Sequence, residues 1–260
     1  MPILKRGPNS SLFKYPSDNY LLVKYLDITK FISLLQRESL FFCRLDILED
    51  HFEGTTSSLN QEKRYEYFAN QHNYISGDPK LTDREIVENV HKLNQEEEKF
   101  KKLVCVSCWN KSKNESAALW KIYSDLNKGI MITSKVRNII EAFSETSENI
   151  EFTEVVYINY NTDIMPDSSK WDTIYHKHKA YEYENEVRLI FTQNFDTTLT
   201  YDWNKEEVQE GKYISLEIRD LIDEIIISPY APQWFFELVK DIIQKYGLNK
   251  PVMASELSKN

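Results

Sequence analysis

Strand-like apolar segments and amphipathic helical segments follow one another along this chain of 260 residues without a regular strand–helix period. The expected strands cover residues 21–25, 39–45, 103–109, 130–133, 152–158, 184–192, 213–218 and 224–228, and the expected helices begin near residues 27, 82, 112, 136 and 232. A doubly wound parallel sheet would alternate strand and crossover helix. The irregular order therefore predicts an α+β fold in which a mainly antiparallel sheet is surrounded by helices.

Glycine is scarce, with only 6 residues in the whole chain. Dinucleotide-binding folds of the Rossmann type and nucleotide-binding P-loops both need several glycines in one turn, where the backbone approaches phosphate closely. The chain contains no such turn, and it also lacks the Gly-x-Ser-x-Gly and His-Glu-x-x-His motifs of hydrolases and zinc proteases. The scarcity of glycine therefore excludes the Rossmann and P-loop folds.

We expect one domain over residues 1–260, with a helical insertion or lid over residues 59–102. That segment is rich in Gln, Glu, Lys and Asn, and the capping box Thr82-Asp-Arg-Glu85 predicts the start of a helix inside it. A second capping box, Ser112-Lys-Asn-Glu115, predicts another helix start after the insertion.

The net charge of -9 opposes non-specific attraction to nucleic acid or to anionic lipid. No stretch has the length and apolar composition of a membrane span or a signal peptide, so we expect a cytoplasmic protein with no membrane partner. Three cysteines are too few for a disulfide framework.

Cys105 and Cys108 have the spacing of zinc ligands or of a redox pair, and His176 and His178 could complete a zinc site. Both cysteines lie in an apolar segment that reads as a strand, where residues at odd spacing point to opposite faces. We therefore favour buried, inert cysteines and expect no metal site.

The segment Tyr181-Glu-Tyr-Glu184-Asn-Glu186-Val-Arg188 concentrates charge next to aromatic residues. In a strand, Glu184, Glu186 and Arg188 would share one face. Repulsion between neighbouring carboxylates suits a catalytic cleft, but a solvated edge strand tolerates it equally well. Alone, the segment fits both interpretations.

Three further positions are candidates for ligand contacts. Trp120 and Tyr123 are three residues apart on one expected helix and either pack in the core or form a stacking wall for a planar ring. Arg44 ends an apolar strand, where a guanidinium needs an anionic partner or ligand. The carboxylates that follow it, between Asp46 and Glu53, fit a structural loop better than a cation site because the spacing of Ca²⁺ and Mg²⁺ loops is missing.

Four blocks, in this order, resemble the bacterial domain-of-unknown-function family 2971. They are Leu22-Val-Lys-Tyr25, Leu40-Phe-Phe-Cys-Arg-Leu-Asp-Ile-Leu-Glu-Asp-His-Phe-Glu-Gly54, Cys105-Val-Ser-Cys-Trp109 with Leu119-Trp-Lys-Ile-Tyr123, and Glu184-Asn-Glu-Val-Arg188. The chain departs from the family pattern at Glu49-Asp50-His51, where the family has Asn-Asp-Pro, and at Tyr181, where it has Trp.

The layout also looks like that of ADP-ribosyltransferases, which carry a Glu-x-Glu after a basic residue on an early strand and an aromatic-rich middle. This resemblance implies a split, mainly antiparallel sheet and NAD as substrate. The roles it implies are a carboxylate at the ribose for Glu186, acceptor positioning for Glu184, nicotinamide stacking for Trp120 or Tyr123, and pyrophosphate contacts for Arg44 or Lys24, with Tyr25 and Arg188 as further ligand-binding residues.

The function that this layout implies is transfer of ADP-ribose to a macromolecular acceptor, either protein or nucleic acid. The protein would act as an effector, as in a toxin–antitoxin or antiviral defence system, with an antitoxin or other protein as partner. Two alternatives remain: a non-catalytic recognition subunit of a defence system, and a metal-dependent nuclease that uses Asp46, Asp50, Glu184 and Glu186.

Overall fold

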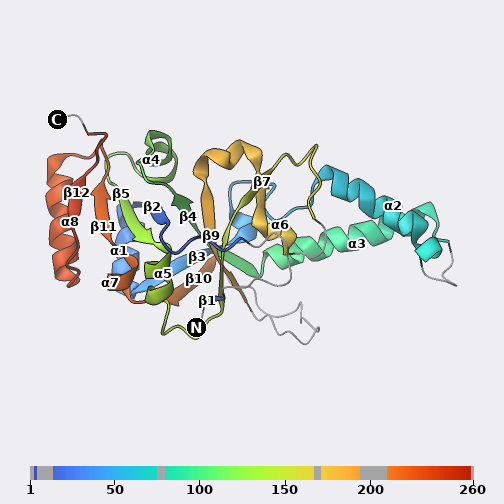
Figure 1. The fold of residues 1–260 in the computed structure, drawn as a ribbon, viewed down its shortest axis with the longest axis horizontal. Coiled ribbons are helices and arrows are strands. Elements are labelled where there is room, and N and C mark those ends of the chain that lie inside the picture. The colour runs from blue at the N-terminus through green and yellow to red at the C-terminus, as the bar shows by residue number, and fades with distance from the viewer. Residues whose placement is uncertain (1–2, 5–13, 75–79, 167–170, 194–209, 259–260) are drawn as a thin grey trace.

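The computed structural model describes residues 3–4, 14–74, 80–166, 171–193 and 210–258. Its centre is a ten-stranded sheet (Figure 1). The main path runs β1 (Ile3–Leu4), β6 (Ile150–Glu154), β9 (Glu186–Thr192), β4 (Val104–Lys111), β2 (Leu21–Asp27), β5 (Gly129–Lys135), β11 (Glu224–Ile227) and β12 (Val252–Ala254). Two more strands lie off this path: β3 (Ser39–Arg44) pairs with β4, and β10 (Gly211–Ser215) pairs with β3. Among the described strands of this sheet, only the pairs β1–β6 and β11–β12 are parallel, which confirms the predicted α+β fold with a mainly antiparallel sheet.

The sheet divides at β4. The end of β4 near Cys105 pairs with β3, whereas the end near Asn110 pairs with β2. Between these two ends, Ser107 to Trp109 have no register partner in β2 or β3, although the other edge of β4 pairs continuously with β9. The divergence of β2 and β3 from β4 creates a fork in the sheet.

The two faces of the sheet are covered by different helices. Alternation along β2 sends Leu22 and Leu26 into the main core, which they share with α1 (Ile28–Arg37), α5 (Val136–Ala142), α7 (Ile218–Leu221) and α8 (Gln233–Lys245). Val23 and Tyr25 join a second cluster with α4 (Ala117–Tyr123). A third cluster packs β4 and β9 against α3 (Asp83–Lys101) and α6 (Asp172–Tyr175).

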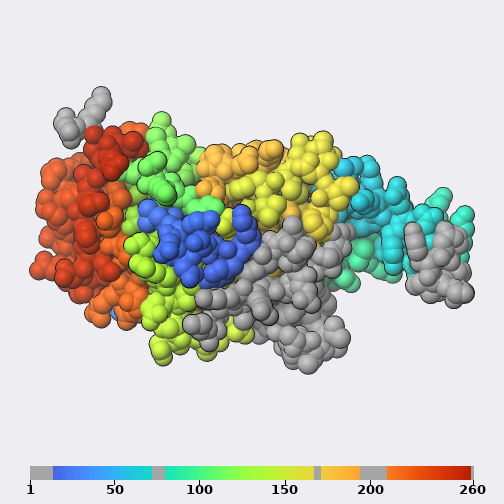
Figure 2. Space-filling view, in the orientation of Figure 1, coloured from blue at the N-terminus to red at the C-terminus, as the bar shows by residue number. Residues whose placement is uncertain are grey.

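α2 (Ser58–Tyr74) and α3 pair with each other and extend away from the sheet as a long arm (Figures 1 and 2). The capping box predicted at Thr82 and Glu85 is present and starts α3. At the base of the arm, Arg64 forms an ion pair with Glu97, and Phe100 packs into the third cluster. None of the described helices has the length and apolar character needed to cross a membrane.

Two local predictions from the sequence are wrong. Ser112-Lys-Asn-Glu115 does not start a helix: α4 begins at Ala117 with Ser116 as its N-cap. The Glu115 carboxylate instead accepts hydrogen bonds from the indole of Trp120 and from the C-terminal segment at Ser255 and Glu256. Those long-range contacts remove Glu115 from the capping role.

The strand expected from Glu184 begins two residues later, at Glu186. Residues Lys179–Glu184 form a 3-10 helix, η2, and Asn185 adopts the left-handed conformation with φ of 45°. Asparagine tolerates this conformation better than most residues. Glu184 is therefore the last residue of the 3-10 helix, and Glu186 is the first residue of the strand.

Candidate active site

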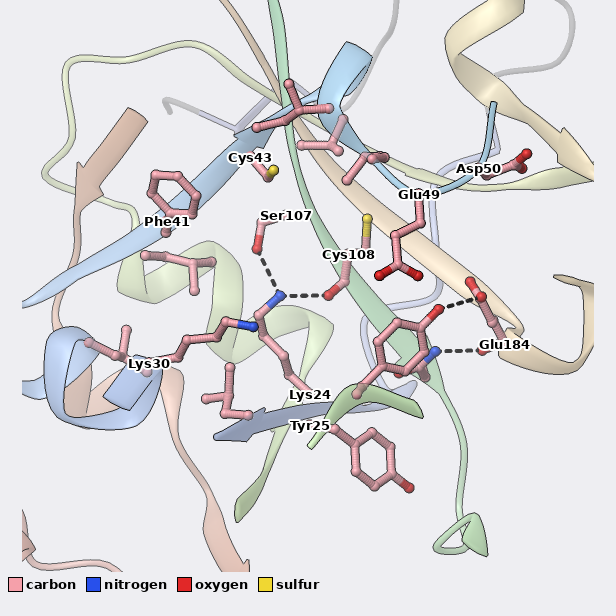
Figure 3. Close-up of a pocket in the computed structure, with 18 of the residues that line it drawn as sticks. Lys24, Tyr25, Lys30, Phe41, Cys43, Glu49, Asp50, Ser107, Cys108 and Glu184 are labelled. Carbon is pink, nitrogen blue, oxygen red and sulfur yellow. Dashed lines mark hydrogen bonds between the residues drawn. The ribbon is translucent and has the colours of Figure 1, made fainter. Parts of the chain in front are cut away.

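A cavity of about 700 Å³ opens at the fork in the sheet (Figure 3). Its walls come from β2, α1, β3, the loop after β3, the middle of β4, α4, β8 (His176–His178), η2 and β10. The charged side chains that line it are Lys24, Lys30, Glu49, Asp50, Glu53, Lys177 and Glu184. Because strands that diverge leave a gap beside their free edges, the cavity is a direct product of the sheet topology.

Lys24 occupies the fork itself. Its ammonium donates hydrogen bonds to the backbone carbonyl of Cys108 at 2.7 Å and to the hydroxyl of Ser107 at 3.2 Å. These contacts fill the place that a strand partner of β4 would take. Burial lowers the pKa of Lys24, and repulsion from Lys30 lowers it further. Lys24 and Lys30 make this end of the cavity cationic.

Glu184 lies at the opposite, acidic end of the cavity, as Figure 3 shows. One carboxylate oxygen accepts a hydrogen bond of 2.5 Å from the hydroxyl of Tyr123, and the other accepts one of 2.7 Å from the ammonium of Lys177. Burial raises the pKa of Glu184, although both donors favour its ionised form. The Glu184 side chain is thus held at both oxygens and faces the cavity.

Glu186 lies behind Glu184 and is fully enclosed. Lys177 donates to its Oε2 at 2.8 Å, and Arg188 donates to its Oε1 at 2.6 Å. Burial alone would raise the pKa of Glu186, but the charges of Arg188 and Lys177 outweigh that effect and hold it well below its usual range. Lys177 therefore binds both glutamates of the Glu-x-Glu and fixes them relative to each other.

A third glutamate completes the buried network. Glu53 accepts a hydrogen bond of 2.6 Å from Arg188, whose guanidinium also donates to the carbonyl of Ile174 at 2.8 Å. Burial raises the pKa of Glu53. Three carboxylates thus share the two cations Lys177 and Arg188, so the network carries an excess negative charge when all its members are ionised.

The structure brings together four of the eight predicted site residues on the cavity wall: Lys24, Tyr25, Tyr123 and Glu184. Glu186 and Arg188 form the layer directly behind them. Tyr25 stands in β2, and its hydroxyl accepts a hydrogen bond of 3.0 Å from the backbone N–H of Ser116.

The other two predicted residues, Trp120 and Arg44, are not among the residues that line this cavity. Trp120 is fully buried and packs edge-on against Tyr25, with 4.9 Å between ring centroids. Arg44 forms an ion pair of 2.6 Å with Asp46. For either residue to contact a ligand in the cavity, its side chain would have to leave these partners.

Lys177 was missed by the sequence reasoning. It lies in β8 (His176–His178), a short strand that pairs with β7 (Val156–Ile158). The sequence feature that could have pointed to such a lysine is the negative charge of the Glu-x-Glu, because two buried carboxylates need a cation between them. The sequence favours a structural role over a cation site for the loop that contains Glu49 and Glu53, and the structure shows that both residues line the cavity.

Cys105 and Cys108 lie in β4, as predicted, and on different sides of it. Cys105 belongs to the main core, whereas Cys108 borders the cavity. Burial raises the pKa of the Cys105 thiol to about 12, and burial likewise raises that of Cys108. Within the described ranges no three His, Cys, Asp or Glu side chains are placed to hold a metal ion.

The solved structures that are similar to this chain include three of Thermus sp. 2.9 DarT. The complex with carba-NAD+ is 9% identical with a TM-score of 0.37, and the match covers 94% of this chain and 98% of that one. The complex with ADP-ribosylated ssDNA is 10% identical with a TM-score of 0.36, and the match covers 94% of this chain and 97% of that one. The complex with NAD+ is 9% identical with a TM-score of 0.38, and the match covers 94% of this chain and 98% of that one.

The comparison of sequences gives one family. No curated protein matches the chain significantly. Residues 119–189 match the family described as "Protein of unknown function (DUF2971)", and this segment includes Tyr123, Lys177 and the Glu-x-Glu. The resemblance to domain-of-unknown-function family 2971 is confirmed over residues 119–189.

Proposed function

We propose that this protein is an NAD-dependent ADP-ribosyltransferase that transfers ADP-ribose to a macromolecular acceptor. The observation that carries the proposal is the charge distribution of the cavity, which has Lys24 and Lys30 at one end and Glu184 at the other. NAD has the complementary distribution, with an anionic pyrophosphate and a cationic nicotinamide ring joined by a ribose. A cavity of about 700 Å³ is within the usual range for a small-molecule site.

In this proposal, the cationic end binds the pyrophosphate. The Lys24 ammonium already donates to uncharged oxygens of Ser107 and Cys108, and a phosphate oxygen would give it a charged acceptor in addition. Binding would also favour the charged form of Lys24, which burial disfavours. Lys30, which lines the same end and is more exposed, adds a second positive charge.

Glu184 and Glu186 act as one unit in this reaction. Cleavage of the bond between ribose and nicotinamide passes through an oxocarbenium-like transition state, which a fixed carboxylate next to the ribose stabilises. Of this pair, Glu184 is the carboxylate that lines the cavity, while Glu186 orients Lys177, which in turn holds Glu184. We therefore assign the ribose contact to Glu184 and retain Glu186 as the residue that organises the pair.

Aromatic side chains surround this acidic end. Tyr25, Tyr123 and Tyr181 all line the cavity, and Lys177 lies 4.9 Å from the ring centre of Tyr181. An aromatic wall next to a carboxylate suits a cationic, planar ring such as nicotinamide. Tyr123 lines the cavity, so we assign the nicotinamide contact to Tyr123 and not to Trp120.

The direct test is release of nicotinamide from NAD by the purified protein, followed by chromatography with and without protein and nucleic-acid acceptors. We expect turnover by the wild type and a loss of roughly 10²-fold or more for Glu184→Gln, because one preorganised electrostatic contact has about that effect on rate. Glu186→Gln should also reduce turnover. If the wild type releases no nicotinamide with any acceptor, the proposal fails and the recognition-subunit alternative takes its place.

We further propose a biological role for this activity, in which the protein is the toxin of a toxin–antitoxin or antiviral system. Transfer of ADP-ribose to an essential macromolecule would arrest growth of the expressing cell. We expect wild-type expression to be toxic and Glu184→Gln to relieve the toxicity at equal protein level. Equal growth of cells that express either protein would rule out a toxic effector.

A further inference from the structure

Glu49 is a carboxylate that lines the cavity and has no hydrogen-bond or ion-pair partner among the residues that the structure describes. Its side chain is exposed. Figure 3 shows it pointing into the cavity, and in this view its carboxylate lies between Cys108 and Glu184. It is therefore free to meet a second substrate that enters beside Glu184.

The other carboxylates of the cavity lack this freedom. Both oxygens of Glu184 accept hydrogen bonds, from Tyr123 and Lys177. Glu53 is bonded to Arg188 through Oε1, and its Oε2 is enclosed by protein. Asp50 accepts from the backbone N–H of Phe52 through Oδ1, and its Oδ2 is likewise enclosed.

Hydrogen bonds of the residues on either side of Glu49 fix the backbone that carries it. The preceding residue, Leu48, is bonded through its N–H to the carbonyl of Leu45 at 3.3 Å. The following residue, Asp50, closes a turn in which its carbonyl accepts from Glu53 N–H at 3.0 Å and its side chain accepts from Phe52 N–H at 2.9 Å. The carboxylate of Glu49 is thus presented by an ordered loop whose own hydrogen bonds do not use it.

We propose that Glu49 is the general base that deprotonates the acceptor. The inference rests on the proposed function, since it assigns the second substrate of the same site. An acceptor that carries an O–H or N–H group gives its proton to the carboxylate of Glu49 and forms a bond to C1′ of the ribose. The bond from C1′ to nicotinamide breaks, and its electron pair leaves with neutral nicotinamide. The proton then passes from Glu49 to solvent.

The test compares two nucleophiles on the same substrate. Water must lose a proton to react with NAD, whereas azide is already an anion and needs no base. General bases contribute roughly 10²-fold to 10⁴-fold to rate. We therefore expect Glu49→Gln to lower hydrolysis of NAD by about that factor and to leave the rate of formation of ADP-ribosyl azide within about twofold of the wild type, with both products measured by mass spectrometry.

Two further variants separate chemistry from structure. Glu49→Asp keeps the carboxylate on a shorter arm and should recover part of the hydrolysis. His51→Asn changes an exposed neighbour in the same loop that is not among the lining residues, so both reactions should stay at the wild-type rate.

The possible failures are distinct. If Glu49→Gln hydrolyses NAD as fast as the wild type, Glu49 is not the base and the proposed function stands. If the variant loses the hydrolysis and azide reactions equally, Glu49 has a structural or binding role and the inference is overturned. If the wild type consumes no NAD, the proposed function fails and the inference fails with it.

Discussion

The ammonium of Lys24 lies 2.7 Å from the backbone carbonyl of Cys108, in the part of β4 where neither β2 nor β3 provides a partner. A side chain thus supplies a hydrogen bond that a neighbouring strand would normally provide. The same ammonium lines the cavity. The same group therefore contributes to the structure of the fork and, in the proposed function, to ligand binding.

Removal of Lys24 should affect stability and affinity separately. Lys24→Met leaves the Cys108 carbonyl without its donor, and an unsatisfied buried group costs about 1–3 kcal/mol. Lys24→Gln keeps an N–H donor without the charge, so it should retain more stability but bind NAD as weakly as Lys24→Met. Urea denaturation and calorimetric titration with NAD measure the two effects, and equal affinity of wild type and Lys24→Gln would exclude a pyrophosphate contact.

Glu186→Gln should destabilise the protein in a pH-dependent way. A glutamate whose pKa is lowered by folding contributes stability above the pKa of the unfolded chain, and this contribution is lost as the pH falls through the folded value. Breaking one partner out of a buried ion pair costs about 3–5 kcal/mol.

The measurement for Glu186 is urea unfolding at pH 7 and at successively lower pH. The difference from wild type should be greatest at pH 7 and should shrink only in acid, below the ordinary range of glutamate. Glu182→Gln is the matched control, because Glu182 is exposed in the same segment and should change the unfolding free energy by less than about 0.5 kcal/mol. A difference that does not vary with pH would show that the charge of Glu186 is irrelevant.

Tyr123→Phe removes the hydroxyl that donates to Glu184. Because this hydrogen bond lowers the pKa of Glu184 against the effect of burial, its loss should raise that pKa further. The acid limb of the pH profile for nicotinamide release should then move to higher pH, and turnover at neutral pH should fall by about tenfold, the effect of one hydrogen bond to a charged group. Tyr183→Phe changes an exposed tyrosine outside the set of lining residues and should leave the profile in place.

Gly54→Ala and Gly247→Ala form a matched pair, because both glycines have φ of 66°. A side chain in this left-handed conformation costs roughly 1–2 kcal/mol at either site. At Gly54 a Cβ would also lie 2.6 Å from Cδ of Lys101 and 2.9 Å from a methyl of Leu45, whereas at Gly247 the nearest atom is 4.0 Å away. Thermal unfolding should therefore show the greater loss for Gly54→Ala, and equal losses would mean that Lys101 moves aside without cost.

Most strands of the sheet could be predicted from the sequence because each strand is marked by a run of apolar residues within its own segment. Apolar runs marked β2, β3, β4, β5 and β11, and the capping box at Thr82 marked α3. The prediction at Ser112 failed because Glu115 binds Ser255, a residue 140 positions away, and local pattern contains no trace of that contact. The fork in the sheet has the same origin, since it depends on which strands pair rather than on where each strand lies.

The site was predictable in part for a related reason. Glu184 and Glu186 are candidates in the sequence because they lie next to aromatic residues and Arg188, in one of the four blocks that carry the family resemblance. Lys177 is one lysine among 32 basic residues, and its role arises only when β8 is placed beside η2. Trp120 shows the converse, because a residue that looked suited to stacking is needed to pack against Tyr25 in the interior.

The cavity at the fork has a floor formed by backbone atoms, which side-chain substitutions do not remove, and a rim formed by side chains, which substitutions do change. The floor of the cavity is the backbone of β4, and its carbonyl at Cys108 would survive replacement of the side chain that bears it. The rim consists of the loop after β3 and of η2, which carry Glu49 and Glu184. If the proposed function holds, mutations in the loop after β3 and in η2 could change which substrate is bound, while the backbone of β4 that forms the floor stays the same.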